Sequence, residues 1–270
     1  MKRSVLGRVA AQQIVGEGLL LHRLRLLRKS PSTQALDVTK TMTSFASMKS
    51  EFSGLRVRAG EDDLRDKSFS HAFFSGCSVQ PSTQSAARFH IRRVSATKCK
   101  HGACNLHGAA FHDVRVSDLT GGGRAPTFLW GCVFSNVVIQ GPVSGLMFRS
   151  QVRAEDEAMN ARYEAEAARF YADVSLALDI SEARFSAVEA LYGVPHELVR
   201  RNPETQFVML REYIPRVKEI AGHPSVWSVI ARPLELSDAS GVVVVLGHKD
   251  KKFKETLQEA LSLRAKGALV

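Results

Sequence analysis

The chain has 270 residues and a formal net charge of +10, and 44% of its residues are hydrophobic while 24% are charged. This length and composition exclude an intrinsically disordered protein and predict a hydrophobic core in one large domain or two ordinary ones. No apolar run is longer than Val242–Leu246, which is far shorter than a transmembrane helix requires. Four cysteines are too few for a disulfide-stabilised secreted module, so we expect a reduced, cytoplasmic protein.

The positive charge is concentrated in the first part of the chain. Residues 1–30 and 31–149 each carry a net charge of +6, whereas residues 150–270 carry −2. We therefore expect an acidic partner to meet the first 149 residues. Many basic proteins bind no nucleic acid, so the charge alone does not identify that partner.

The first 32 residues predict a basic N-terminal helix. Its apolar stripe consists of Leu19, Leu20, Leu21, Leu24 and Leu27. Ser30-Pro31-Ser32 ends the pattern, because Ser and Pro are typical of a helix stop. The Arg-rich, acid-poor composition of residues 1–30 is also typical of an organelle transit peptide, which stays open as an alternative.

An apolar pattern with a period of five residues runs through much of the chain. In each block a small or compact residue is followed, two positions later, by a larger apolar residue. The clearest blocks begin at Cys104, Ala109 and Val114. Similar blocks occupy residues 67–81, 132–141 and 178–188.

This period fits neither a helix, whose apolar residues recur every three or four positions, nor an alternating strand. It indicates a chain that turns a corner every five residues and points two side chains inward from each short extended side. Gly, Asn and Asp suit such corners because they tolerate unusual backbone angles. Four sides would close a coil, and stacked coils would pair at the ordinary strand spacing of ~4.8 Å. We expect Phe74, Leu106, Phe111 and Phe134 to fill the core.

With blocks such as Cys104-Asn105-Leu106 and Ala109-Ala110-Phe111, the chain resembles the pentapeptide-repeat family. The resemblance covers residues 42–149 and 175–192 with gaps, and it implies a right-handed quadrilateral β-helix. The family's block is Ala-(Asp/Asn)-Leu followed by two variable residues. Asp or Asn is mostly absent from the middle position here, and residues 82–98 and 120–130 break the phase. An irregular antiparallel β-domain is the alternative.

We therefore predict a mainly β protein in three parts. A basic N-terminal helix occupies residues 1–32, a β-helix domain occupies residues 33–194, and a small C-terminal α/β cap or domain occupies residues 195–270. Within the β-helix domain, apolar residues at helical spacing after the acidic cluster Glu155-Asp156-Glu157 predict an inserted helix over residues 151–173.

The C-terminal segment contains helix and strand signals. Asn202-Pro203-Glu204-Thr205 is typical of a helix start and predicts a helix over residues 204–221, broken at Pro215. Val242–Leu246 predicts a buried strand. Asp250 can cap a last helix that ends at Gly267.

Cysteine and histidine are dense between Cys99 and His112, and these residue types can bind zinc. Cys99 and Cys104 are five residues apart, as are His107 and His112, so each pair would lie on adjacent walls of a four-sided coil. We therefore expect structural cysteines, histidines that face solvent and no metal site. The glycine run before Arg124 lacks the Lys-Ser/Thr of a phosphate-binding loop and predicts a flexible loop.

Two basic groups are the candidate binding residues. The first group lies in the same stretch of sequence as Phe89, where the five-residue pattern fails, and we expect it on an exposed loop. It consists of Arg88, Arg92, Arg93, Lys98 and Lys100. The second group follows the strand at Val242–Leu246 and begins the last helix: Lys249, Lys251, Lys252 and Lys254. Basic side chains at such positions can bind phosphate or nucleic acid, although solvated lysines are the simpler interpretation.

The chain carries no nucleophile motif and no dinucleotide fingerprint, so neither an enzyme activity nor a cofactor is predicted. Some members of the family that it resembles inhibit type II topoisomerases by mimicking DNA with an acidic surface, a role that this basic chain does not fit. We expect a non-enzymatic scaffold that presents a rigid β-helical surface to a macromolecular partner, which we expect to be a protein. The alternatives are a basic nucleic-acid-binding module and an immunity-type protein that binds one specific protein. The oligomeric state stays open.

Overall fold

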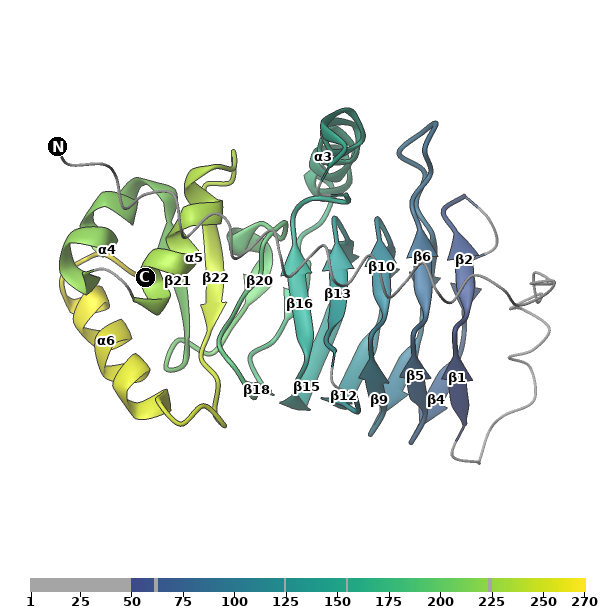
Figure 1. Cartoon of the computed structure of the whole chain (residues 1–270), viewed down its shortest axis with the longest axis horizontal. Helices are drawn as coiled ribbons and strands as arrows, with labels where there is room; N and C mark the ends of the chain where they lie inside the picture. The colour runs from purple at the N-terminus through teal and green to yellow at the C-terminus, as the bar shows by residue number, and fades with distance from the viewer. Residues whose placement is uncertain (1–49, 61–62, 124, 154, 223–224) are drawn as a thin grey trace, which may run out of the picture. The chain divides into compact units, whose positions relative to one another are not determined.

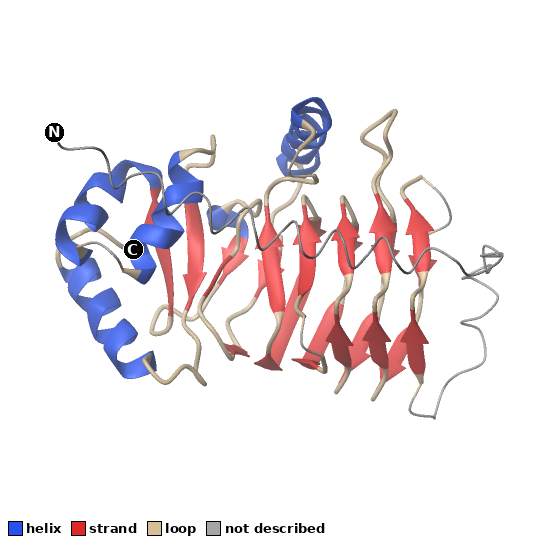
Figure 2. Cartoon of the chain, in the orientation of Figure 1, coloured by secondary structure: helices blue, strands red, loops and turns tan. Residues whose placement is uncertain are grey.

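A computed structural model describes residues 50–60, 63–123, 125–153, 155–222 and 225–270. The described chain is mainly β, with several parallel sheets of short strands and few helices (Figure 2). The sheets are not closed on themselves. The basic helix that we expected over residues 1–32 lies outside the described residues.

Three parallel sheets contain the strands of the predicted repeat region. The first has the order β1-β5-β9-β12-β15-β17-β20, with β4, β8 and β18 paired beside this path. Its strands are β1 (Glu51–Ser53), β4 (Ser68–Ser70), β5 (Phe73–Ser75), β8 (Ser95–Thr97), β9 (Lys100–Gly102), β12 (Arg115–Gly121), β15 (Val137–Val143), β17 (Leu178–Asp179), β18 (Ala183–Phe185) and β20 (Val199–Arg200).

The other two parallel sheets have the orders β16-β13-β10-β6-β2 and β14-β11-β7-β3. The strands of the former are β2 (Arg56–Arg58), β6 (Ser78–Gln80), β10 (Asn105–His107), β13 (Thr127–Trp130) and β16 (Leu146–Arg149). The strands of the latter are β3 (Leu64–Arg65), β7 (His90–Arg92), β11 (Ala110–His112) and β14 (Val133–Ser135). Figure 1 shows the strands of each sheet side by side along the stack.

The register places apolar residues from successive passes of the chain directly beside one another. Leu106 pairs with Val79 on one side and with Leu129 on the other. Phe111 and Phe134 also pair, and their rings stack with centroids 5.2 Å apart. Phe134 is buried, while Phe74, Leu106 and Phe111 are half-buried and pack against buried clusters. The four residues therefore contribute to the core as expected.

The backbone bends at the spacing that the sequence blocks predict. Residues with positive φ follow one another at intervals of five: Arg93 (50°), Lys98 (52°), Ala103 (53°), Gly108 (64°), Asp113 (54°) and Asp118 (57°). Side chains other than Gly, Asn and Asp rarely adopt this conformation. Its regular recurrence is therefore imposed by the pairing of the short strands on either side.

The inserted helix is α3 (Glu157–Ala172), within the predicted residues 151–173 (Figure 1). Asp156 caps it, because its carboxylate accepts a hydrogen bond from the Met159 backbone N–H at 2.9 Å. Met159 and Tyr163 are buried together with Val152. The Tyr163 hydroxyl donates to the Ala87 carbonyl at 2.8 Å and so ties α3 to the loop before β7.

The C-terminal segment forms an antiparallel sheet with helices, and one prediction there is wrong. The sheet has the order β19-β22-β21, from β19 (Glu189–Ala190), β21 (Gln206–Leu210) and β22 (Gly241–Val245). The helices are η1 (His196–Leu198), η2 (Arg211–Tyr213), α4 (Ile214–Ala221), α5 (Val226–Glu235) and α6 (Phe253–Ala265). The first half of the predicted helix 204–221 is thus a strand, because its apolar residues pair with β22.

The other C-terminal predictions agree more closely with the structure. The strand expected at Val242–Leu246 is β22, and the last helix ends before Gly267, whose φ is 68°. Asp250 is not the cap that we expected, because Lys252 holds the N-cap position of α6; the Asp250 carboxylate accepts a hydrogen bond from the Lys252 backbone N–H at 2.9 Å in the preceding turn. Since β19 precedes residue 195 but pairs with β22, the antiparallel sheet extends across the expected boundary between the two parts.

Candidate binding surface

Arg88 is not part of an exposed basic group. It is 5% exposed, and its guanidinium donates to the carbonyls of Gly131 at 2.8 Å, Tyr163 at 3.1 Å and Gly108 at 3.3 Å. Its Cζ also lies 5.1 Å from the centroid of the Tyr163 ring. The expectation that Arg88 lies on an exposed loop is wrong, because α3 packs over the segment and encloses the side chain.

The other residues of the first basic group lie on the surface or near it. Arg92 is half-buried and its Nη2 lies 2.9 Å from His90 Nδ1. Arg93 is exposed and makes a two-pronged contact with the Asp66 carboxylate at 2.6 and 2.9 Å. Lys98 and Lys100 are exposed around the corner between β8 and β9, which are strands and not the loop that we expected.

The second basic group is exposed on the connection from β22 to α6. Lys249, Lys251 and Lys252 lie in the turn, and Lys254 is in the first turn of the helix. The Lys249 backbone N–H donates to the Ser186 carbonyl at 3.2 Å. This contact holds the turn next to β18, so the structure places the two basic groups on different connections.

The cysteines and histidines between Cys99 and His112 make contacts within the stacked strands. Cys99 and Cys104 are buried, and their thiols donate to the carbonyls of Phe69 at 3.8 Å and Phe74 at 3.5 Å. His107 donates to the Val152 carbonyl at 2.6 Å. His107 and His112 are both half-buried, so the expectation that they face solvent is only partly right. No group of three His, Cys, Asp or Glu side chains in the described chain is arranged to hold a metal ion.

A surface that the sequence analysis did not identify lies on the β16-β13-β10-β6-β2 sheet. The central residue of each strand, such as Val79 or Leu129, points into the core, so the residues flanking it point outward. We call the outward set the Trp130 face; it consists of Arg56, Arg58, Ser78, Gln80, Asn105, His107, Phe128, Trp130, Met147 and Arg149. None of these positions holds Asp or Glu.

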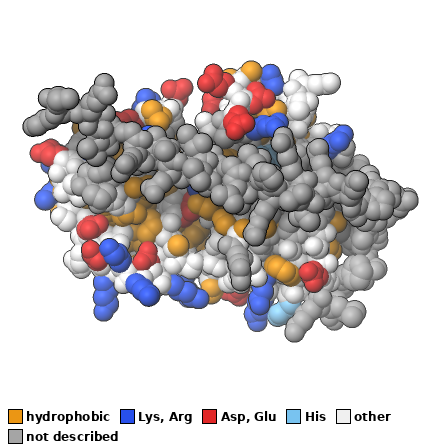
Figure 3. Space-filling model, in the orientation of Figure 1, with side chains coloured by type: hydrophobic (Ala, Val, Ile, Leu, Met, Phe, Trp, Pro, Cys, Tyr) orange, Lys and Arg blue, Asp and Glu red, His pale blue; other side chains and the backbone are white. Residues whose placement is uncertain are grey.

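The rings of the Trp130 face are stacked on one another. The Trp130 ring lies 5.2 Å from that of Phe128 and 5.9 Å from that of His107, nearly parallel to both. The Trp130 indole N–H donates to the Asn105 side-chain oxygen at 3.4 Å. These contacts hold the three half-buried rings together on this sheet. Figure 3 shows Lys and Arg side chains along the lower margin of the molecule and scattered hydrophobic patches above them.

Arg149 is held in place at one end of the Trp130 face. Its Nη1 donates to the Phe148 carbonyl at 2.7 Å, and its Cζ lies 6.0 Å from the centroid of the Phe128 ring. Glu189 of β19 approaches the same guanidinium at 3.6 Å. Burial raises the pKa of Glu189 to about 7, although the charge of Arg149 acts in the opposite direction.

Glu189→Gln is expected to remove a fall in stability between pH 5 and 7. The folded protein holds a proton on Glu189 up to a pKa of about 7, whereas the unfolded chain releases it near 4.5, so stability decreases as the pH rises through this window. At about pH 8 the variant should be more stable than the wild type by about 2–3 kcal/mol, an upper bound since Arg149 loses a partner. Urea unfolding across this pH range measures the difference.

The free energy of unfolding at the acid end of the same pH range serves as the control. Burial and the neighbouring Arg92 lower the pKa of His112 to about 4, so its contribution to stability is present above pH 6.5 and is lost as the pH falls through about 4. Below about pH 4.5 Glu189 is protonated in both the folded and the unfolded chain, so Glu189→Gln should leave the pH dependence there unchanged. If the variant changed the free energy of unfolding equally at every pH, the loss of stability above pH 5 could not be assigned to Glu189.

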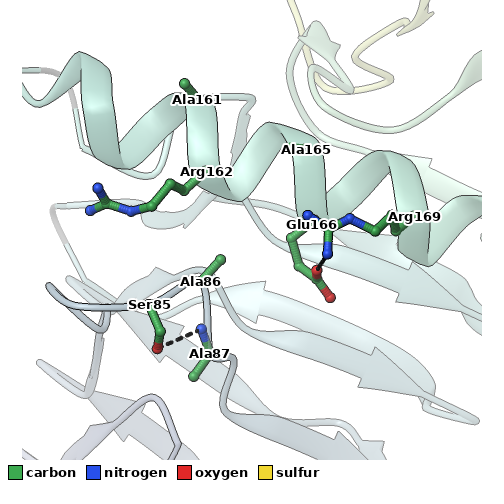
Figure 4. A pocket seen from close by; sticks show the side chains of 8 residues that line it. All are labelled: Ser85, Ala86, Ala87, Ala161, Arg162, Ala165, Glu166 and Arg169. Atoms are coloured by element: carbon green, nitrogen blue, oxygen red, sulfur yellow. Dashed lines mark hydrogen bonds and ion pairs between the residues drawn. The ribbon is translucent and has the colours of Figure 1, made fainter.

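An open pocket of about 660 Å³ lies between α3 and the loop before β7 (Figure 4). Its lining consists of Ser85, Ala86, Ala87, Ala161, Arg162, Ala165, Glu166 and Arg169. Glu166 is already paired with Arg169 at 3.5 Å, and Ser85 accepts from the Ala87 N–H at 3.3 Å. Half of its lining residues are alanine, so it offers fewer groups for recognition than the Trp130 face.

No protein-family model, curated protein or solved structure matches the chain. Among the described helices, none has the length and apolar character needed to cross a membrane. The candidate surface therefore rests on the geometry of the chain's own residues.

Proposed function

We propose that the chain is a non-enzymatic scaffold that binds a protein partner on the Trp130 face. The supporting architecture would be a right-handed β-helix of the pentapeptide-repeat type, in the cytoplasm. The parallel register between successive passes and the positive φ values at intervals of five residues support this arrangement. A stack of this kind has little freedom to rearrange, because each strand inside a sheet is held by two neighbours.

The composition of the Trp130 face carries the proposal. The centres of protein–protein interfaces are enriched in aromatic residues, Met and Arg and are depleted in Lys, Glu and Asp. The Trp130 face joins Phe128, Trp130, Met147 and Arg149 on two adjacent strands and lacks all three depleted types. Truncating Trp or Arg to alanine is also among the changes that most often cause a large loss of binding free energy.

Affinity capture from a nuclease-treated lysate of the native host tests this function. The wild type is compared with Trp130→Ala and Arg149→Ala, and with Arg115→Ala as the matched control. Arg115 is an exposed arginine on β12, in a different sheet. We expect a protein that the wild type and Arg115→Ala retain and that both Trp130-face variants lose. Equal retention by all four proteins would contradict the proposal.

Nucleic-acid binding is the second candidate function, and the exposed Lys98 and Lys100 favour it. Such binding would weaken steeply with added salt, because bound phosphates release counterions. It would also depend on these lysines and be insensitive to Trp130→Ala. Undetectable binding to single- and double-stranded oligonucleotides at about 50 mM salt would eliminate it.

A further inference from the structure

We infer that the partner of the Trp130 face is an acidic protein segment that places carboxylates against the arginines at both ends and an apolar side chain between them. The inference rests on the proposed function and specifies the chemistry of the partner. Arg56 lies on β2 at one end of the sheet, and Arg149 lies on β16 at the other.

Charge complementarity favours an acidic occupant. No outward position on the five strands carries a negative charge, and residues 1–149, which include the whole face, hold all the excess positive charge of the chain. Glu189 approaches only Arg149 and comes from a neighbouring strand of another sheet. Complementary potentials of this kind guide association and exclude partners of the same sign.

The arrangement of the rings favours a protein over a single-stranded nucleic acid. Nucleobases bind by stacking on open aromatic faces. Trp130 already stacks with both His107 and Phe128, and the Arg149 guanidinium lies over Phe128, so these rings are engaged with one another. Together with the half-buried Met147 side chain they form a surface that suits contact with an apolar side chain.

The preset position of Arg149 favours carboxylate recognition. The hydrogen bond to the Phe148 carbonyl uses one N–H of the guanidinium and fixes its plane. The remaining N–H groups can donate to a carboxylate in a two-pronged geometry, and less rotamer entropy is lost because the side chain is already ordered. A nearby Phe128 ring keeps part of this site away from water.

Fluorescence anisotropy with three labelled polymers tests the inference on the full-length protein. The probes are a random copolymer of Glu and Tyr, a random copolymer of Lys and Tyr, and single-stranded oligo(dT). Random copolymers are used because they present charged side chains and Tyr at many different spacings along the chain. We expect the Glu–Tyr copolymer to bind, and to bind less tightly as the salt rises from about 50 to 300 mM.

The variants decide whether this binding occurs at the Trp130 face. Arg149→Ala and Trp130→Ala should each weaken binding of the Glu–Tyr copolymer about tenfold, while Arg115→Ala should change it less than about twofold. Circular dichroism verifies that the variants keep the β structure. Equal binding of the Lys–Tyr copolymer, tighter Trp130-dependent binding of oligo(dT), or no effect of Arg149→Ala would overturn the inference.

The two proposals fail in distinguishable ways. A captured protein that depends on Trp130, together with no Arg149-dependent binding of the acidic copolymer, would leave the scaffold function intact and contradict the acidic partner. Loss of Trp130 dependence in both experiments would contradict the scaffold function itself.

Discussion

Replacing Arg88 by alanine is expected to lower the free energy of unfolding by about 3 kcal/mol. The guanidinium holds the carbonyls of Gly108, Gly131 and Tyr163, and its removal leaves these acceptors without their charged donor. Removing a buried charge also relieves its desolvation cost, which is why the net loss is smaller than three full charge-assisted bonds.

The matched control is Arg115→Ala, which truncates an exposed arginine and should change stability by less than about 0.5 kcal/mol. Arg88→Met keeps much of the aliphatic stem and separates the loss of packing from the loss of hydrogen bonds. Urea unfolding followed by circular dichroism gives the three values. A loss below about 1 kcal/mol for Arg88→Ala would contradict its role in joining α3 to the stack.

Gly108→Ala is expected to cost about 2–5 kcal/mol, the sum of backbone strain and overpacking. Gly108 has a φ of 64°, and a Cβ atom there would lie 2.4 Å from Cε1 of Tyr163. The Tyr163 ring cannot yield easily, because its hydroxyl is bonded to the Ala87 carbonyl and the residue is buried. The substitution therefore forces α3 away from the neighbouring strands.

Gly54→Ala isolates the backbone component of this effect. Gly54 has a nearly identical φ of 66°, but a Cβ atom there meets nothing within 4 Å. Its loss should be about 1–2 kcal/mol, the cost of the left-handed conformation alone. Equal losses for the two variants in denaturant unfolding would contradict the packing of Tyr163 on Gly108.

The five-residue spacing predicts much of the parallel-sheet region because it couples local geometry to burial. Each apolar residue that we expected in the core, such as Leu106 or Phe134, is the centre of a short strand and pairs with its equivalent in the next pass. The corners at Gly108, Asp113 and Asp118 follow the sequence blocks, whereas those at Arg93 and Lys98 lie in residues 82–98, where we expected the phase to fail, and are occupied by side chains that seldom favour positive φ. Pairing on both sides of each corner overrides that local preference.

Two predictions failed for reasons that only tertiary structure reveals. The segment Gln206–Leu210 follows a helix-like start but is a strand, because short apolar runs do not distinguish the two and β22 offers a pairing edge. The Gln206 side chain also donates to the Ile180 carbonyl at 2.9 Å, a contact with the preceding stack. Arg88 was expected on the surface, since no local signal shows that α3 returns to cover it.

The Trp130 face escaped the sequence analysis because residues 120–130 depart from the five-residue phase. Phe128 and Trp130 alternate with the buried Leu129, which is a strand signal, but their proximity to His107 and Arg149 depends on the register between strands. Aligning the outward positions of successive passes would have brought these residues together. The basic residues, in contrast, are visible in sequence but are distributed over separate connections.

Methyl–methyl nuclear Overhauser effects test the central claim, the parallel stacking of successive passes, most directly. In a deuterated sample with labelled Leu, Val and Ile methyl groups, Leu106 should show contacts to both Val79 and Leu129, its partners in register. If Phe is also incorporated in protonated form, contacts from the Leu129 methyl groups to the Phe148 ring protons should continue the same series. Leu106 methyl contacts confined to residues three or four positions away, as in a helix, would contradict the stack and the surface built on it.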